Sequence, residues 1–474
     1  MEMVRNNKDD WGDLDNSQIT RVLSRFVADL TYEDLSPEVV EWAKFLCLDF
    51  AGVTLNGSTT DSANALVEAL NSVGRGGPST VIGTSEKVLP EYAALANGTA
   101  FHSIEMDDVN LEACLHPGVT AYPTALAMAD VVEVSGKDFI TAVVAGYDVI
   151  VRLGRGLVGA EHYARGFHPT GTCGAFGAAA VAARLMGLKG ESLAHALGIA
   201  GSQTSGSMEY LAQGAWTKRL HPGWASHSGI WAALMARSGY TGPTTIIEGR
   251  DGFLQAYSDN PEPGLVLKDL GEEYQVTRTS IKPHTCCRFK HGPIDCLLDL
   301  KRAYGIDPMD VAEVRVGVVS AGMKLVSEPI EAKRTPKTVV DMQFSMPFGA
   351  AVALTHGRAS LEEYQLGMPE NPAVKHVMER VHCMTDPALD ALTPKQMPAW
   401  AEVDTNDGRT LRSEVGYPKG DPENPVTWDE MKEKFIMLSS PVIGHERQQE
   451  IIAAVESLEQ MSDVRQLAEL LSTC

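Results

Sequence analysis

The chain has 474 residues, of which 44% are hydrophobic, and its formal net charge at neutral pH is -22. This length exceeds what one simple core holds, so we expect two domains, and the hydrophobic content excludes extensive disorder. The acidic balance argues against a nucleic-acid partner or an anionic membrane surface, although a local cluster of cations could still bind an anionic substrate.

The cysteines and the N-terminus bear on the compartment. None of the eight cysteines forms a CxxC pair, and Cys286 and Cys287 are adjacent, which suits neither an ordinary disulfide nor a zinc site. Residues 1–16 lack the apolar run of a signal peptide, and no stretch reaches about 18 uninterrupted apolar residues. We therefore expect a cytoplasmic protein with reduced thiols and no membrane span.

The first half of the sequence predicts one helix after another. Ser36 and Pro37 suit the N-cap and first position of a helix whose apolar spacing continues to Asn56-Gly57. Residues 171–187 are unusually small, which predicts a central, buried helix; their GxxGxxG spacing is not the dinucleotide fingerprint, and no Walker A motif occurs. Further helices are expected over 17–31, 62–74, 90–105, 121–134 and 138–158.

The character of the chain changes near residue 272. Alternation over 314–318 predicts a strand, 335–356 a helix, and Asn406-Asp407-Gly408 a hairpin turn, before helical patterns return at 428–438 and 444–472. We therefore predict a mainly α protein with a second α+β domain. A large all-helical domain would comprise residues 1–272 and 412–474, and a smaller α+β lid domain residues 273–411.

Four polar clusters interrupt the apolar background. The clusters are Glu105 to Asp108 with Leu115 to Gly118, then Gly166 to Gly171, Thr217 to Gly223, and Lys282 to His291. Each cluster also has a purely structural interpretation. In the same order, these are a solvated helix end with a capping role, a threonine cap at 170 or 172, a surface loop, and a solvated charge run.

Together the clusters indicate one kind of chemistry. They supply several histidines and lysines with nearby acids, whereas HExxH, GxSxG and any metal-ligand spacing are absent. Histidine titrates near neutral pH, and cations stabilise the enolate-like charge that develops when a proton moves at a carbon beside a carboxylate. The sequence therefore favours proton transfer on a small polycarboxylate.

At these clusters the sequence resembles the MmgE/PrpD family, which includes 2-methylcitrate dehydratases, cis-aconitate decarboxylases and iminodisuccinate epimerases. The resemblance implies a helical domain with an α+β lid, a homodimer, and catalysis without metal or organic cofactor. The segments that carry it, in order over nearly the whole chain, are FHSIEMDDVNLEACLHPG, GFHPTGTCGAFGAAA, TKRLHPGWASHSG, GFLQAY, IKPHTCCRFKHGPID and DMQFSMPF.

The resemblance also implies site residues. His116 would move the proton at carbon, Lys218 and His168 would hold carboxylates and assist loss of the leaving group, and Asp107 would orient a histidine or a bound hydroxyl. The other residues that the resemblance places at the substrate are Asp108, Lys282, His284, His291 and Phe348.

Two positions depart from the family pattern. Phe348 stands where decarboxylase-like members often have tyrosine, and His284 where an aromatic residue is more usual. The leading expectation is a lyase most like cis-aconitate decarboxylase. A 2-methylcitrate dehydratase, an iminodisuccinate-type epimerase and a non-catalytic binding protein on the same fold stay open.

Overall fold

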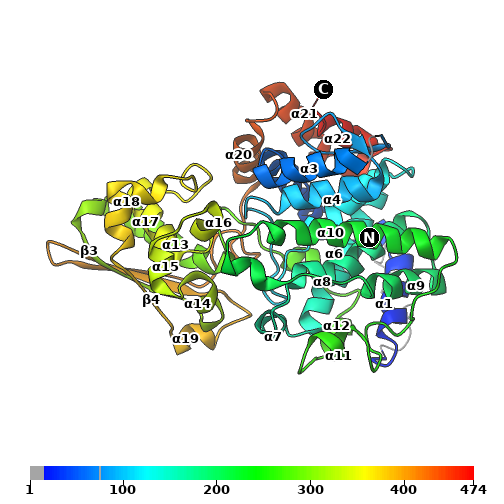
Figure 1. The fold of residues 1–474 in the computed structure, drawn as a ribbon, viewed down its shortest axis with the longest axis horizontal. Helices are drawn as coiled ribbons and strands as arrows, with labels where there is room; N and C mark the ends of the chain where they lie inside the picture. The colour runs from blue at the N-terminus through cyan, green and yellow to red at the C-terminus, as the bar shows by residue number, and fades with distance from the viewer. Residues whose placement is uncertain (1–14, 74–75, 474) are drawn as a thin grey trace, which may run out of the picture.

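Helices make up most of the chain, and they gather in one lobe beside a smaller lobe that contains the main sheet (Figure 1). The computed structural model describes residues 15–73 and 76–473. The expectation for residues 1–16 therefore falls almost wholly outside the described residues. Within those ranges, no helix combines the length and the apolarity that crossing a bilayer requires.

The larger lobe begins with helices whose ends follow the predicted signals. The Ser36 side chain accepts from the backbone N–H of Val39 at 3.3 Å, and Pro37 occupies the first turn of α2. The helices of this part are α1 (Ile19–Asp29), α2 (Pro37–Gly57), α3 (Asp61–Val73), α4 (Pro90–Phe101), α5 (Gly118–Ala129), α6 (Gly136–Gly156), α7 (Gly159–Ala164), α8 (Pro169–Leu185), α9 (Gly190–Gly201), α10 (Thr217–Arg237), α11 (Phe253–Tyr257) and α12 (Gly264–Leu267), with a two-stranded ribbon of β1 (Ser79–Thr80) and β2 (Lys87–Val88).

The small-residue helix α8 is central, as predicted. It packs against α5, α6, α9 and α10. A Cβ at Gly177 would lie 2.1 Å from Ile150 of α6, and one at Gly174 would lie 2.7 Å from Thr120 of α5. Only glycine permits these close approaches, so the composition of α8 sets the spacing of the helices that carry the candidate site.

The smaller lobe is built on a four-stranded sheet of order β4-β3-β5-β6. The predicted hairpin is present, with β5 antiparallel to β6 and Ala401 opposite Ser413, while β3 pairs with β4 in parallel. The elements of this lobe are α13 (His291–Tyr304), β3 (Val311–Gly317), α14 (Ser320–Val326), α15 (Ile330–Arg334), α16 (Val339–Gln343), α17 (Met346–His356), α18 (Pro372–Met378), β4 (Val381–Met384), α19 (Pro387–Asp390), β5 (Ala399–Thr405) and β6 (Thr410–Val415).

The last helices rejoin the larger lobe, where α20 and α21 pack on α2 and α22 contacts α5; Figure 1 shows all three on the side of the larger lobe. Met431, Phe435 and Ile451 belong to the same hydrophobic cluster as the N-terminal helices, whereas the smaller lobe has its own cluster between Cys286 and Leu411. The exact domain boundaries stay a prediction. These helices are α20 (Trp428–Ser439), α21 (His445–Glu456) and α22 (Arg465–Leu470).

Two predicted helices are divided in the structure. The helix expected over 335–356 breaks between α16 and α17, where the Ser345 side chain accepts from the N–H of Phe348 at 3.0 Å and Pro347 cannot donate to the preceding turn. The helix expected over 444–472 is interrupted between α21 and α22 by the short 3-10 helix η8 (Leu458–Gln460). The other 3-10 helices are η2 (Tyr32–Asp34), η3 (Met208–Ala212), η4 (Gln275–Arg278), η5 (Arg288–Lys290), η6 (Pro308–Asp310) and η7 (Met368–Glu370).

Candidate active site

The segment that follows α4 carries the acidic groups of the candidate site. Residues 102–108 form neither helix nor strand, yet every one of them is buried. Glu105 has a φ of 57°, a left-handed conformation that is uncommon for a residue other than glycine. Such strain persists only where the surroundings over-determine it, and it concentrates at functional sites.

Asp107 lies between two imidazoles. Its Oδ2 is 2.8 Å from Nδ1 of His102 and 2.9 Å from Nδ1 of His116. Nδ1 of His116 also lies 2.6 Å from the carbonyl oxygen of Asp108, and because a carbonyl can only accept, this nitrogen carries the proton. Nε2 of neutral His116 therefore carries a lone pair, which is the tautomer that a general base needs.

The Asp107 carboxyl group is ionised. Burial alone would raise the pKa of Asp107, but the Lys282 ammonium 3.6 Å away, His116 and His102 outweigh burial and hold the pKa well below its ordinary value. An ionised Asp107 also stabilises the imidazolium that His116 becomes after it accepts a proton.

Glu105 lies between two buried lysines. Lys218, in the first turn of α10, donates to Oε1 of Glu105, and Nζ of Lys282 lies 3.3 Å from Oε2. The exposed fractions of Glu105, Lys218 and Lys282 are 4%, 5% and 0%. Burial and the neighbouring Lys282 ammonium lower the pKa of Lys218 well below its ordinary value. The Glu105 carboxylate that Lys218 contacts opposes this shift and favours the ammonium form. With both lysines protonated, the triad holds two ammonium groups side by side, where the low exposure to water strengthens their interaction with anions.

His168 lies beside the same imidazoles, immediately before α8. Its ring stacks on His102 with centroids 5.6 Å apart, and the ring of His102 meets that of His116 edge-on at 4.9 Å. Burial lowers the pKa of His168 well below its ordinary value, so its ring is neutral at pH 7. Three buried atoms here lack a hydrogen-bond partner among the described residues: Nε2 of His168, Nε2 of His102 and Oδ1 of Asp107. Unsatisfied polar atoms gathered in this way are typical of a site that awaits a ligand.

Both the smaller lobe and the C-terminal helices close on this segment. Nε2 of Gln343 donates to the carbonyl of Ile104 at 3.2 Å, and Nζ of Lys218 lies 5.2 Å from the ring centroid of Phe344. On the other side, Nζ of Lys434 in α20 lies 2.5 Å from Oδ1 of Asp49 and 2.9 Å from the carbonyl oxygen of Met106. The acidic segment thus accepts hydrogen bonds from three distant stretches of chain, which are α10, the end of α16, and α20.

Five of the predicted site residues meet in this network: His116, His168, Lys218, Asp107 and Lys282. All are buried, and they come from the first turn of α10, the segment between α4 and α5, the N-cap of α8, and the start of the smaller lobe. Three structural alternatives are wrong. The stretch 217–223 lies in α10 and not in a surface loop, neither Thr170 nor Thr172 caps α8, and the exposed fractions of Lys282, Lys290 and His291 are all 0%.

Asp108 makes contacts that hold the fold together. Its carboxylate accepts from the N–H of Gly118 at 3.1 Å and from the Tyr147 hydroxyl at 2.6 Å, so it caps α5 and joins it to α6. Burial raises the pKa of Asp108 to about 7, although the Tyr147 hydrogen bond opposes this. These contacts place the Asp108 carboxylate in the packing between α5 and α6, and its expected contact with substrate stays a prediction.

Three further predicted residues also have their polar or packing contacts inside the smaller lobe. Nε2 of His284 lies 2.7 Å from Oδ1 of Asp295, and both ring nitrogens of His291 are engaged, one by Arg288 and one by the carbonyl of Cys286. Phe348 is fully buried in the core of this lobe, where its ring meets Tyr364 edge-on at 5.2 Å. These contacts give no sign of the substrate role expected for His284, His291 and Phe348.

The predicted set omits residues that the structure places in the network. Glu105, His102, His221 and Gln343 all lie inside the sequence segments singled out above, but spacing alone does not distinguish them from their neighbours. The feature that marks Glu105 is its backbone conformation, and the feature that marks Gln343 is a contact between lobes. Neither is visible in a sequence pattern.

A metal ion would meet an unfavourable charge here. Donor atoms of His102, Asp107 and His116 lie within 4.8 Å of one another, close enough to share an ion. However, the Lys282 ammonium already lies 3.6 Å from Asp107 and would repel a divalent cation. The donor set therefore fits the proton chemistry of paired imidazoles better than metal binding.

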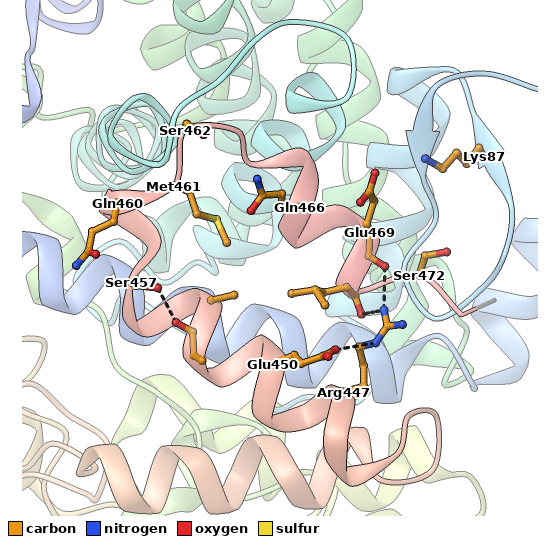
Figure 2. Close-up of a pocket in the computed structure, with 13 residues that line it drawn as sticks. Lys87, Arg447, Glu450, Ser457, Gln460, Met461, Ser462, Gln466, Glu469 and Ser472 are labelled. Atoms are coloured by element: carbon orange, nitrogen blue, oxygen red, sulfur yellow. Dashed lines mark hydrogen bonds and ion pairs between the residues drawn. The ribbon is translucent and has the colours of Figure 1, made fainter.

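Figure 2 shows a separate pocket, formed by α21, α22 and the neighbourhood of β2, that none of the network residues lines. Of its two cations, Lys87 and Arg447, the second already lies 3.3 Å from Glu450 and donates to the carbonyls of Glu469 and Leu470. Because the Arg447 guanidinium is already paired within the protein, we infer no function for this pocket.

Known proteins resemble the chain over nearly its full length. Residues 21–266 match the MmgE/PrpD N-terminal domain, and residues 284–460 match the MmgE/PrpD C-terminal domain. The cis-aconitate decarboxylase-like protein oryM of Aspergillus oryzae is 31% identical over 96% of this chain and 97% of its own length. The cis-aconitate decarboxylases of Aspergillus terreus and Homo sapiens are 27% and 25% identical, over 96% of this chain and 96% and 94% of their own lengths. The chain therefore belongs to the MmgE/PrpD family.

Proposed function

We propose that the protein is a lyase that decarboxylates a small di- or tricarboxylate, with cis-aconitate as the first substrate to test. The observation that carries this proposal is the network itself, in which two buried ammonium groups lie beside an Asp107-paired imidazole. The names of the relatives support decarboxylation as the reaction. The homodimer and the absence of an organic cofactor, both implied by the resemblance, stay predictions.

Lys218 and Lys282 are the proposed carboxylate anchors. A carboxylate bound between them would form charge-assisted hydrogen bonds in a site where burial removes competing water. Glu105 holds both ammonium groups in place before the substrate arrives, and this preorganisation lowers the cost of ordering them on binding.

His116 is the proposed proton carrier. In the reaction the bond to the departing carboxylate breaks, carbon dioxide leaves, and the electron pair is delocalised onto a neighbouring carboxylate that the ammonium groups stabilise. His116, which has taken up a proton from solvent at Nε2 and is paired with ionised Asp107, then gives that proton to the carbon and returns to its neutral form. His168 is proposed to hold a second carboxylate through Nε2.

The same groups would also serve dehydration of a 2-methylcitrate-like substrate or epimerisation, so product analysis decides between these reactions. Purified protein should be incubated with cis-aconitate, 2-methylcitrate and iminodisuccinate, with the products identified by mass spectrometry. We expect loss of carbon dioxide from cis-aconitate. Loss of water from 2-methylcitrate with no release of carbon dioxide from cis-aconitate would refute the proposal.

The variant His116→Ala tests the proposed proton carrier. We expect it to lose activity by at least about 10²-fold, because general acid–base catalysis contributes about 10²–10⁴-fold. His195→Ala is the matched control, since that ring bonds to the carbonyl of Gly242 at 2.8 Å and lies outside the network. Circular dichroism should show that both variants are folded, and wild-type turnover by folded His116→Ala would remove His116 from the mechanism.

A further inference from the structure

Two histidines from different helices share one hydrogen bond at the edge of the network. Nδ1 of His168 lies 3.0 Å from Nδ1 of His221, and the ring centroids are 5.2 Å apart. His168 is fully buried, whereas His221, in the first turns of α10, is partly exposed. Neither the sequence motifs nor the proposed reaction assigns a role to His221.

The surroundings fix the two rings in this arrangement. The backbone N–H of His168 donates to the carbonyl of Gly206 at 2.9 Å, and Tyr210 meets both imidazoles edge-on with centroids 6.2 and 6.0 Å away. Gly206 has a φ of 143°, and a Cβ there would lie 3.4 Å from Cβ of His168 and 3.5 Å from Nδ1 of His221. These are ordinary packing distances, so the two rings are packed, and glycine is favoured at position 206 by its positive φ and not by a lack of space.

The hydrogen bond allows only two arrangements of protons. Burial lowers the pKa of His168 well below its ordinary value and that of His221 to about 4, so both rings are neutral at pH 7. A neutral imidazole carries one proton, and one of the two facing Nδ1 atoms must supply the bridging hydrogen. If His221 donates, the proton of His168 is on Nε2; if His168 donates, Nε2 is a bare lone pair.

The proton arrangement determines whether Nε2 of His168 can donate a hydrogen bond to a ligand. Its Nε2 is buried beside His102 and has no hydrogen-bond partner among the described residues. A carboxylate can accept a hydrogen bond but cannot donate one, so only the arrangement with hydrogen on Nε2 can bind it. A bare lone pair at this position would repel the same carboxylate.

We propose that His221 is a positioning residue that donates its Nδ1 hydrogen to His168 and thereby holds His168 with a hydrogen on Nε2, aimed at a substrate carboxylate. This role rests on the proposed function only in the identity of the ligand, a small polycarboxylate. It explains why a histidine on α10 packs against the buried ring. A hydrogen-bonded partner on one nitrogen is the usual way in which a protein selects the tautomer of a histidine.

Two substitutions of His221 distinguish the effect of its hydrogen bond to His168 from the effect of its side-chain volume. In His221→Asn, the amide can place an N–H near the position of Nδ1 and still donate to His168. In His221→Leu, the volume stays similar but no donor is left. His227→Leu is the matched control, because His227 lies on the same helix, is also partly buried, and stacks on Trp224 with centroids 4.9 Å apart.

The first measurement needs no turnover. Nitrogen-15 spectra of histidine-labelled protein report which ring nitrogen carries hydrogen, and the His168 signals are assigned by their loss in His168→Gln. We expect hydrogen on Nε2 of His168 in the wild type and in His221→Asn, and a loss of this preference in His221→Leu. A wild-type spectrum with hydrogen on Nδ1 of His168 would overturn the proposal.

The second measurement is the binding of propane-1,2,3-tricarboxylate, a non-reactive tricarboxylate, by titration calorimetry. We expect His221→Leu to bind about 10-fold more weakly, as for loss of part of one charge-assisted hydrogen bond, with His221→Asn and His227→Leu close to wild type. Equal affinity in all variants would contradict the proposal. Binding without decarboxylation in the wild type would refute the proposed reaction but not this role, whereas decarboxylation with the opposite tautomer would refute this role alone.

Discussion

Removing the negative charge of Glu105 should destabilise the fold far more than removing an ordinary surface charge. In Glu105→Gln, the buried Lys218 ammonium loses the carboxylate that it contacts, while Lys282 keeps Asp107 at 3.6 Å. Breaking a buried ion pair by removing one partner costs about 3–5 kcal/mol, because the other charge stays buried and uncompensated. We therefore expect the free energy of unfolding to fall by roughly that amount at pH 7.

The loss should shrink as the pH rises. Burial and the Lys282 ammonium already lower the folded-state pKa of Lys218 below its unfolded value, and the loss of the Glu105 carboxylate in the variant lowers it further. The unfolded chain then binds more protons than the folded one in that window, and stability increases with pH until Lys218 is neutral in both states. Urea unfolding followed by tryptophan fluorescence, from neutral to alkaline pH, measures both effects through the shift in midpoint.

A surface pair provides the control for this experiment. Glu33 lies 3.6 Å from Lys137, with side chains 75% and 51% exposed, and Glu33→Gln should cost less than about 1 kcal/mol. The double variant Glu105→Gln with Lys218→Met should recover part of the stability, since no uncompensated ammonium is left at position 218. A cost for Glu105→Gln no larger than that of Glu33→Gln would refute the reasoning that these charges are effectively buried.

Three further predictions concern the same region. Lys218→Met should lower kcat/KM by on the order of 10²-fold in steady-state assays, because a charge-assisted contact to the substrate is lost, and an unchanged value would exclude it as an anchor. Asp108, whose pKa is raised to about 7, holds a proton in the folded state that the unfolded chain releases between about pH 4 and 7, so stability falls as the pH rises through this range. Asp108→Asn should lack that fall in thermal melts, and a parallel fall in both proteins would contradict this pKa. Extensive dialysis against EDTA should leave activity intact, because the Lys282 ammonium disfavours a divalent ion beside Asp107; loss of activity restored by a metal would reverse that conclusion.

Much of the fold follows from local signals in the sequence. Ser36-Pro37 begins α2 as expected, the hairpin at Asn406-Asp407-Gly408 is present, and the small residues of 171–187 form the central helix. The two helices that break, at Ser345 and near Leu458, keep a helical apolar pattern across the break, so periodicity alone does not show it. Ser345 with Pro347 two residues later is the start signal of a new helix, but the apolar run on both sides of it favours one continuous helix.

The candidate site was only partly predictable, because its members are selected by contacts between distant segments. His116, His168 and Lys218 belong to polar clusters within an otherwise apolar sequence, and the structure brings them into one network. Asp108 has the same residue type and neighbourhood as Asp107, yet it faces Gly118 and Tyr147. In an irregular segment, neighbouring residues such as Asp107 and Asp108 point their side chains in different directions. The positive φ at Glu105 departs from helix and strand geometry, so residue spacing does not predict which of the two carboxylates faces the site.

The contact of α20 with the acidic segment has a consequence for how the protein is made. Every group proposed to touch substrate has been synthesised once the chain reaches residue 282, but Lys434, which bonds Asp49 and the carbonyl of Met106, comes some 150 residues later. This contact is therefore non-local and forms late. A nascent chain that ends before α20 therefore carries the reacting groups without the brace that orders them. Premature stop codons beyond the last proposed anchor but before α20 should then yield inactive protein, and the chain gains its activity only after α20 has been synthesised.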